Sequence, residues 1–484
     1  MSVSIQIERF VPRIRAFAGR EPLSFSIEKG ESAGALIGPN GAGKTLVTDI
    51  IQGKLLPKEG VVAIKSDIDR PTYQLIKSIS FRDIYSLADC REAYYQQRWN
   101  SFNVEESPIV RTLLNKIPAD KVAYYVSLLH IEPLMEKRLI ALSSGELRKF
   151  LIAKVLMHDP ALLILDNPFI GLDAQSRQSL NELLKEMAQF KGLQILLVLS
   201  HPKDLPEWLD YVVPVKDRKC LEKQTPAKFL QNAELMTALF PEMKTETIVF
   251  PAANNVPHDT YEEAVRMEKV CVQYHEHRLL SNVDWVVKQG EKWALLGENG
   301  SGKSTLLSLI CGDNPQAYAN RITLFGRKRG SGESIWEIKK RIGYLSPDMH
   351  TYYLEDTSCI NVVASGFFDS IGLFRKCNEE QKQLAAAWMR LFRCDHLADC
   401  SFVKISYGEQ RLVLLARAFV KNPELLILDE PLHGLDAGKK ELAKQIIESF
   451  CEQEGKTLLY VTHYEDEIPS CVTQRKVLYK HKEE

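Results

Sequence analysis

Short apolar runs, each followed by a helical pattern, recur along the chain. The run Gly34–Ile37 leads into a glycine-rich stretch and then into the predicted helix Leu46–Gln52. Trp293–Leu296 leads in the same way into Thr305–Ile310. Strands that alternate with helices are typical of a parallel sheet with helices on its faces. The pattern therefore predicts an α/β fold, with a mostly parallel sheet in each half of the chain.

No apolar run is long enough to cross a membrane as a helix. The most apolar runs, Leu193–Leu199 and Leu425–Leu428, fall far short of the roughly 20 residues that a span requires. They predict buried parallel strands instead. The N-terminal segment also lacks the apolar core of a secretory signal. We therefore expect a cytoplasmic protein that associates with a membrane only peripherally, on the cytoplasmic face of the inner membrane.

Several motifs occur twice, in the same order. GPNGAGKT at Gly38–Thr45 returns as GENGSGKS at Gly297–Ser304, and LSSGE, which starts at Leu142, returns as ISYGE, which starts at Ile405. LLILDNP and GLD of the first half return as LLILDEP and GLD, and each half has a histidine after a later apolar strand. Because a repeat of domain length indicates duplication, the sequence predicts two tandem domains of one fold.

The segment between the two copies has the composition of a linker. Residues 241–260 contain three prolines and an Asn-Asn pair, and they show no sustained periodicity. We therefore expect a first domain over residues 1–240, a linker over 241–264 and a second domain over 265–484.

Both glycine-rich stretches match the phosphate-binding P-loop, G-x-x-x-x-G-K-[ST]. Their glycines let backbone N–H groups wrap the phosphates of ATP, and the N-terminus of the following helix adds partial positive charge. Lys44 and Lys303 should reach the β- and γ-phosphates, while Thr45 and Ser304 should bind Mg²⁺. The predicted nucleotide-binding residues of the two loops are Gly38, Pro39, Asn40, Gly41, Ala42, Gly43, Lys44, Thr45, Gly297, Glu298, Asn299, Gly300, Ser301, Gly302, Lys303 and Ser304.

An apolar strand that ends in aspartate is the usual partner of a P-loop. Asp166 and Asp429 hold this position, where the carboxylate is expected to bind Mg²⁺. The next residue is Asn167 in the first half and Glu430 in the second. A carboxylate there can act as a general base toward the water that attacks the γ-phosphate, whereas an amide cannot. We therefore expect both halves to bind Mg·ATP and only the second to hydrolyse it efficiently.

Composition argues against several other classes of protein. The chain has 62 Lys and Arg against 63 Asp and Glu, so there is no overall positive field that would recruit nucleic acid. Its ten cysteines include no C-x-x-C pair, so neither a zinc ribbon nor an iron–sulfur cluster is indicated. Reduced thiols in a cytosolic protein are the simplest interpretation.

Taken together, these motifs resemble the ATP-binding cassette (ABC) family, and they cover nearly all of both halves. The resemblance implies a tandem P-loop ATPase in which each domain also has a helical subdomain. It further implies that the two domains pair head to tail within one chain, so that a monomer would suffice. Each ATP would then lie between the P-loop of one domain and the LS-x-G-E segment of the other.

The same resemblance assigns the remaining residues to two nucleotide sites. To the first P-loop and Asp166 it adds Asn167, His201, Ser406 and Gly408. To the second P-loop and Asp429 it adds Glu430, His463, Ser143 and Gly145.

Some positions depart from the family pattern. Tyr407 stands where the family usually has a glycine, and Pro347 stands where it usually has the glutamine of the glutamine loop. Tyr274 is the predicted residue for adenine stacking in the second half. In the first half, Phe10 and Phe17 are both candidates, and the sequence does not choose between them.

The second half resembles, in particular, twin-cassette ATPases associated with molybdate transport. This resemblance rests on Leu324–Ser346, on GFFDSIGLF at Gly366–Phe374 and on Trp388. The first half resembles the same proteins through its compact LSSGELRK and its lack of a clear glutamine loop. The resemblance implies a role in driving or regulating membrane transport, with a permease subunit as partner and molybdate or another metal oxyanion as substrate. For GFFDSIGLF itself, buried packing and the docking of a partner both stay open.

Two other functions also stay open. One is a soluble mechanochemical ATPase, for instance one that acts on the ribosome, although such proteins generally have a long charged linker, which this chain lacks. The other is a regulatory nucleotide sensor that turns ATP over slowly, which Asn167 and Pro347 favour.

Overall fold

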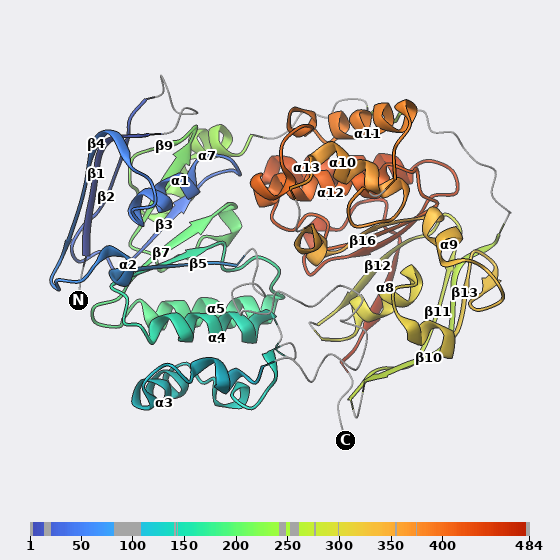
Figure 1. Cartoon of the computed structure of the whole chain (residues 1–484), viewed down its shortest axis with the longest axis horizontal. Helices are drawn as coiled ribbons and strands as arrows, with labels where there is room; N and C mark the ends of the chain where they lie inside the picture. Colours follow the sequence, from blue (N-terminus) through green and yellow to red (C-terminus); the bar gives the residue numbers. More distant parts are fainter. Residues whose placement is uncertain are drawn as a thin grey trace. The chain divides into compact units, whose positions relative to one another are not determined.

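The computed structural model describes residues 3–13, 21–81, 108–139, 142, 144–241, 248–251, 261–274, 277–298, 300–353, 356–373 and 375–480. The chain divides into two compact units, made mainly of the residues up to Glu242 and of those from Met243 on. Each unit contains a mostly parallel sheet, a smaller antiparallel sheet and surrounding helices (Figure 1). The predicted α/β class, with two domains of the same kind, is confirmed.

The larger sheet of the first unit has six strands, five of which run parallel. β3 and β7 are buried along their whole length, as expected for continuous apolar runs that helices cover on both faces. β9 is antiparallel to β8 and closes a tight hairpin at one edge. In spatial order the strands are β5 (Ile76–Ser80), β6 (Leu162–Asp166), β7 (Gln194–Leu199), β3 (Ala33–Ile37), β8 (Tyr211–Lys216) and β9 (Lys219–Cys220).

The smaller sheet of the first unit is antiparallel, in the order β2 (Leu23–Ile27), β1 (Val3–Pro12) and β4 (Pro57–Ser66). Figure 1 shows α4 and α5 side by side next to the larger sheet, with α3 beyond them. The helices are α1 (Lys44–Ile51), α2 (Thr72–Leu75), α3 (Ala119–Leu128), α4 (Ser144–Leu156), α5 (Ala174–Met187), α6 (Pro226–Gln231) and α7 (Ala233–Leu239).

The larger sheet of the second unit repeats the parallel part of the first. Its five strands are all parallel and follow the same spatial order, so the duplication extends to the topology. The strands are β15 (Ile342–Leu345), β16 (Leu425–Asp429), β17 (Thr457–Val461), β12 (Lys292–Gly297) and β18 (Gln474–Leu478). An antiparallel sheet completes the unit, in the order β11 (His277–Lys288), β10 (Glu263–Tyr274), β13 (Arg321–Leu324) and β14 (Arg327–Lys328).

Figure 1 shows α10, α11, α12 and α13 gathered on one side of the second unit's larger sheet. In the part of the chain that the structure describes, no helix has the length and apolar character that a membrane crossing needs. The helices of this unit are α8 (Lys303–Cys311), α9 (Ile335–Arg341), α10 (Cys359–Ala364), α11 (Glu379–Leu391), α12 (Tyr407–Phe419) and α13 (Ala437–Cys451).

The predicted linker partly belongs to the second unit. Phe250 packs against Trp388 and Phe450, with ring centroids 5.7 and 5.9 Å apart. Strand β10 already begins at Glu263, within the segment predicted as linker. The domain limits at 240 and 265 stay predictions.

GFFDSIGLF packs on the core of the second unit. The side chains of Phe367, Phe368, Ile371 and Leu373 are partly buried against this core, whereas Phe374 lies outside the described residues. Helix α12 and the residues that follow it hold the segment with polar groups, because Arg417 donates to the Ser370 carbonyl over 3.2 Å and Lys421 pairs with Asp369. These contacts favour a structural role for the segment.

Candidate functional site

Each P-loop connects a central strand of a parallel sheet to the first residue of a helix. β3 leads through the loop to α1, which begins at Lys44, and β12 leads in the same way to α8, which begins at Lys303. Gly43 and Gly302 immediately precede these helices with φ angles of 103° and 92°, values that glycine alone adopts without strain. This geometry lets successive backbone N–H groups face an anion at the helix N-terminus.

The P-loop lysines are held over their own loops. Lys44 Nζ donates to the carbonyl oxygens of Gly38 and Pro39 over 2.6 and 2.8 Å. Lys303 Nζ makes the equivalent two bonds in the second unit, each 2.8 Å long. The ammonium groups therefore lie where the predicted nucleotide phosphates would meet them, and these residues fit ATP.

In the second unit, a hydroxyl and a carboxylate that suit Mg²⁺ lie together. Ser304 Oγ donates to Asp429 Oδ2 over 3.1 Å, from the start of α8 to the end of β16. Burial, reinforced by the charge of Glu430, raises the pKa of Asp429 to about 7. Hydroxyl and carboxylate oxygens are the protein ligands that Mg²⁺ takes beside nucleotide phosphates. Thr45 is exposed at the corresponding place in the first unit.

Glu430 and His463 form a close pair in the second unit. His463 Nε2 lies 3.0 Å from Glu430 Oε1, although the two residues come from the ends of different strands. Burial alone would raise the pKa of Glu430, but the hydrogen bond with His463 and the charges of His433, His463 and Arg411 outweigh burial and lower it to about 2. The Glu430 carboxylate is therefore ionised near neutral pH, which is the state that a proton acceptor requires.

The first unit places an amide at the position of this carboxylate. Asn167 Nδ2 donates to Asp166 Oδ1 over 2.8 Å, and the Asn167 side chain is buried. His201 accepts a hydrogen bond from the backbone N–H of Lys203 at Nδ1. Both Asn167 and Glu430 have left-handed backbones, with φ angles of 51° and 49°. The two positions are thus equivalent in conformation and differ in chemistry.

The LS-x-G-E segments begin helices α4 and α12. Ser406 caps α12 in a capping box, in which Ser406 Oγ accepts from the Glu409 N–H and the Glu409 carboxylate accepts from the Ser406 N–H. Gly408 lies in the first turn of α12, and Gly145 lies in the first turn of α4. Ser143 lies outside the described residues.

Two buried arginines were missed by the reasoning from sequence. Arg411 of α12 donates to the carbonyl oxygens of Ser346, Asp429, Glu430 and Pro431, at 2.9 Å for Ser346 and Asp429 and 3.1 Å for Pro431. In the first unit, Arg148 of α4 donates to the carbonyls that belong to Pro168 and Ile170. Each arginine therefore ties the helix that follows the LS-x-G-E segment to the loop after the Asp-ending strand. An arginine two positions after Glu in both repeats was the available signal.

The predicted adenine contacts stay predictions. The Tyr274 ring is half-buried against the core of the second unit, and its hydroxyl accepts a hydrogen bond from Asn314 Nδ2 over 2.9 Å. Phe10 is 1% exposed and belongs to the core of the first unit. Phe17, like Asn299 of the second P-loop, lies outside the described residues.

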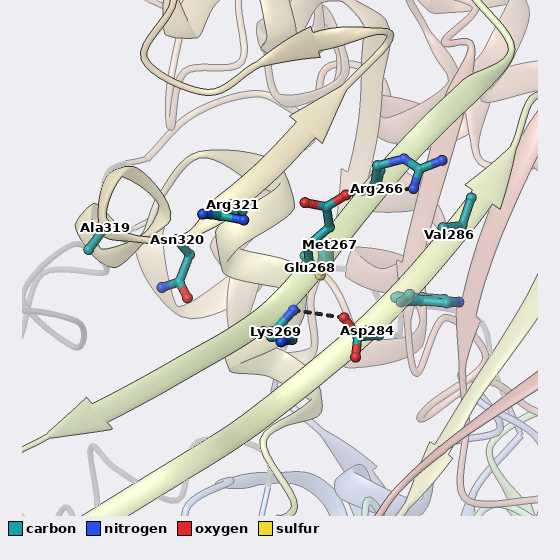
Figure 2. Close-up of a pocket in the computed structure, with 10 residues that line it drawn as sticks. Arg266, Met267, Glu268, Lys269, Asp284, Val286, Ala319, Asn320 and Arg321 are labelled. Atoms are coloured by element: carbon teal, nitrogen blue, oxygen red, sulfur yellow. Dashed lines mark hydrogen bonds and ion pairs between the residues drawn. The ribbon is translucent and has the colours of Figure 1, made fainter.

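A hollow of about 800 Å³ lies on the antiparallel sheet of the second unit (Figure 2). Asp284 Oδ1 accepts from the Lys269 N–H over 2.8 Å inside it. Three basic and two acidic side chains line the hollow, so their charges largely offset one another. Its lining residues are Arg266, Met267, Glu268, Lys269, Asp284, Trp285, Val286, Ala319, Asn320 and Arg321.

Comparisons with known sequences agree with the duplicated α/β fold. A family model described as ABC transporter matches residues 21–170 and 280–433, once in each half. The chain is 36% identical over 453 residues to the ABC transporter ATP-binding protein ModF of Escherichia coli K12, covering 91% of this chain and 90% of ModF. It is 30% identical over 457 residues to an uncharacterised ABC transporter ATP-binding protein of Schizosaccharomyces pombe, covering 91% of each.

Solved structures share the fold at lower identity. The RNase-L inhibitor aligns with a TM-score of 0.50 and 18% identity, covering 92% of this chain and 83% of the inhibitor. A chain of a ribosome-bound archaeal Pelota and ABCE1 complex aligns with a TM-score of 0.55 and 18% identity, covering 89% of this chain and 70% of that one. At such identity the likeness shows the fold alone.

Proposed function

Because the chain belongs to the ABC transporter family, and is therefore an ATPase with two ATP-binding cassettes, we propose that it hydrolyses ATP mainly in its second cassette. Both P-loops would bind Mg·ATP. The observation that carries this proposal is the Glu430–His463 pair, 3.0 Å apart, next to the Ser304–Asp429 pair. The first cassette has the neutral Asn167 in place of the carboxylate.

The second cassette has the groups that phosphoryl transfer to water needs. Lys303 and the P-loop N–H groups would hold the β- and γ-phosphates, and Ser304 with Asp429 would hold Mg²⁺, which neutralises phosphate charge when bound. Glu430 would accept a proton from the attacking water as the water oxygen bonds to the γ-phosphorus. The bond between the γ-phosphorus and the β–γ bridging oxygen would break, and ADP would leave. His463 would orient the Glu430 carboxylate.

We also propose that the two cassettes pair head to tail on ATP. Ser406 and Gly408 would then contact the nucleotide of the first P-loop, and Ser143 and Gly145 the nucleotide of the second. The proposal is supported by the start of α12, because a helix N-terminus favours the negative charge of a γ-phosphate. One chain supplies both halves of such a pair, so a monomer is sufficient.

ATP with Mg²⁺ should therefore make the Glu430→Gln variant more compact, because this variant would bind ATP without consuming it. Small-angle scattering should show a smaller radius of gyration with Mg·ATP than with Mg·ADP. The variant that also carries Lys44→Ala and Lys303→Ala is the control and should not respond. Unchanged dimensions with ATP would contradict the pairing.

The cycle would drive or regulate a membrane transport step, with molybdate or a related metal oxyanion as the expected substrate. This part of the proposal is supported by the resemblance of residues 324–346 and 366–374 to twin cassettes of molybdate transport. A soluble mechanochemical role and a slow sensor role are the alternatives. The sensor role is supported by Pro347, whose side chain has no oxygen with which to contact Mg²⁺ or water.

Cell fractionation should find the protein with membranes through a partner protein. A carbonate wash should release it, because no described helix can span a bilayer, and affinity capture should recover a permease subunit. Recovery with ribosomes in place of membranes would favour the mechanochemical alternative, and recovery with neither would favour the sensor.

A further inference from the structure

The side chain of Tyr407, at the centre of the ISYGE segment, points into its own cassette. Its residue is 9% exposed, although it begins helix α12 in the segment that would face a nucleotide. The Tyr407 hydroxyl lies 3.0 Å from His433 Nδ1, which is hydrogen-bond distance. The tyrosine side chain that stands in place of the family's usual glycine is therefore directed into the second cassette.

The Tyr407 ring fills a close-fitting space. An added Cβ at Gly434 would lie 2.2 Å from Tyr407 Cε1, so the ring can pack here only because residue 434 is glycine. On another side, the His350 ring meets the Tyr407 ring edge to face, with centroids 4.9 Å apart. The ring thus packs between the loop that follows β16 and the segment Pro347–Tyr352.

The loop that Tyr407 contacts is the one that carries Glu430. His433 lies three residues after Glu430, and the His433 N–H donates to the Glu430 carbonyl oxygen over 3.1 Å. Tyr407 and Arg411 are four residues apart on α12 and therefore lie on one face of the helix. Arg411 holds the backbone of this loop, and Tyr407 contacts the His433 side chain within it.

The first cassette cannot make this contact. The residues that match Tyr407 and His433 in the repeat are Ser144 and Ile170, and the isoleucine side chain has no hydrogen-bonding group. The hydroxyl–imidazole pair therefore belongs to the cassette that retains the carboxylate. This correlation connects the pair with hydrolysis rather than with the fold that both cassettes share.

We propose that Tyr407 is a positioning residue for ATP hydrolysis in the second cassette: through His433 it fixes the loop that aims Glu430 at the attacking water. The inference rests on the proposed role of Glu430 as general base. A displacement of about 1 Å in such a group can lower the rate by up to about 100-fold.

The direct test is Tyr407→Phe, which keeps the ring and its packing and removes only the hydroxyl. We expect kcat to fall about 10-fold, with the KM for ATP and the melting temperature close to those of the wild type. Tyr353→Phe is the matched control, because Tyr353 is a buried tyrosine of the same cassette whose hydroxyl lies 3.0 Å from Ser365 Oγ. It should keep the wild-type kcat.

A double-mutant cycle makes the test specific to the pair. His433→Ala should lower kcat less in the Tyr407→Phe background than in the wild type, because the hydrogen bond is already absent. A wild-type kcat for Tyr407→Phe, an equal loss for Tyr353→Phe, a change in KM alone, or independent multiplicative losses would each overturn the inference. Absence of ATP hydrolysis in the wild type would instead overturn the proposed function.

Discussion

Replacement of Glu430 by glutamine should lower steady-state ATP hydrolysis by roughly 10²–10⁴-fold, the usual contribution of a positioned general base. Glutamine is nearly isosteric with glutamate, and its side-chain oxygen can still lie near His463, so the loop geometry should survive. Nucleotide binding depends mainly on the phosphate cradle and should be retained. The measurement is phosphate release at saturating Mg·ATP, together with nucleotide binding by equilibrium dialysis.

The first cassette provides the control for this experiment. Asn167→Ala should change turnover little, because the amide of Asn167 bonds to Asp166 and has no basic group to lose. The pair of variants therefore compares the same backbone position in the two cassettes. If Glu430→Gln retained more than about a tenth of wild-type hydrolysis, the loss of activity would be too small for the removal of a general base. The second cassette would then not be the one that hydrolyses ATP.

Replacement of Arg411 by alanine should lower the free energy of unfolding of the second unit by about 3–5 kcal/mol, because several buried carbonyls would lose their donor. Arg411 is 2% exposed and bonds to carbonyls at and just after the end of β16, including those of Asp429 and Glu430. Hydrolysis should fall as well, since the loop that carries Glu430 would lose its main backbone contact with α12.

Urea unfolding followed by circular dichroism, with the transitions of the two units analysed separately, measures this loss. Arg390→Ala is the matched control, because Arg390 is an exposed arginine on helix α11 of the same unit and should change stability by less than about 0.5 kcal/mol. Arg411→Lys should restore little, because one ammonium group cannot reproduce the planar fork of donors. Equal stability of Arg411→Ala and Arg390→Ala would contradict the assigned role.

The phosphate-binding loops and the parallel strands could be predicted because their signals are local. A P-loop needs glycines, a lysine and a hydroxyl at fixed spacing between a strand and a helix, so the motif predicts the element together with its chemistry. The strand ends at Asp166 and Asp429 follow from continuous apolar runs of the length that a buried strand requires. The repeat then supports each assignment a second time.

Contacts that depend on tertiary packing could not be predicted. The spacing of Arg148 and Arg411 says nothing about which carbonyls lie within reach of a guanidinium. The sequence likewise does not distinguish a Tyr407 ring that faces a nucleotide from one that packs inward on Gly434. Phe10, an open candidate for adenine stacking, lies in the core of the first unit. This burial could not be predicted, because an isolated aromatic residue does not indicate which face of its strand will be covered.

The left-handed backbone shared by Asn167 and Glu430 bears on how the two cassettes could diverge. Asparagine is several-fold enriched in this conformation, whereas a longer side chain such as glutamate stores about 1–3 kcal/mol of strain there. A change from glutamate to asparagine after duplication would thus have relaxed the backbone while it removed the base. The reverse change, from asparagine to glutamate, would have to restore this strain. Loss of the carboxylate from one copy is therefore energetically easier than its return.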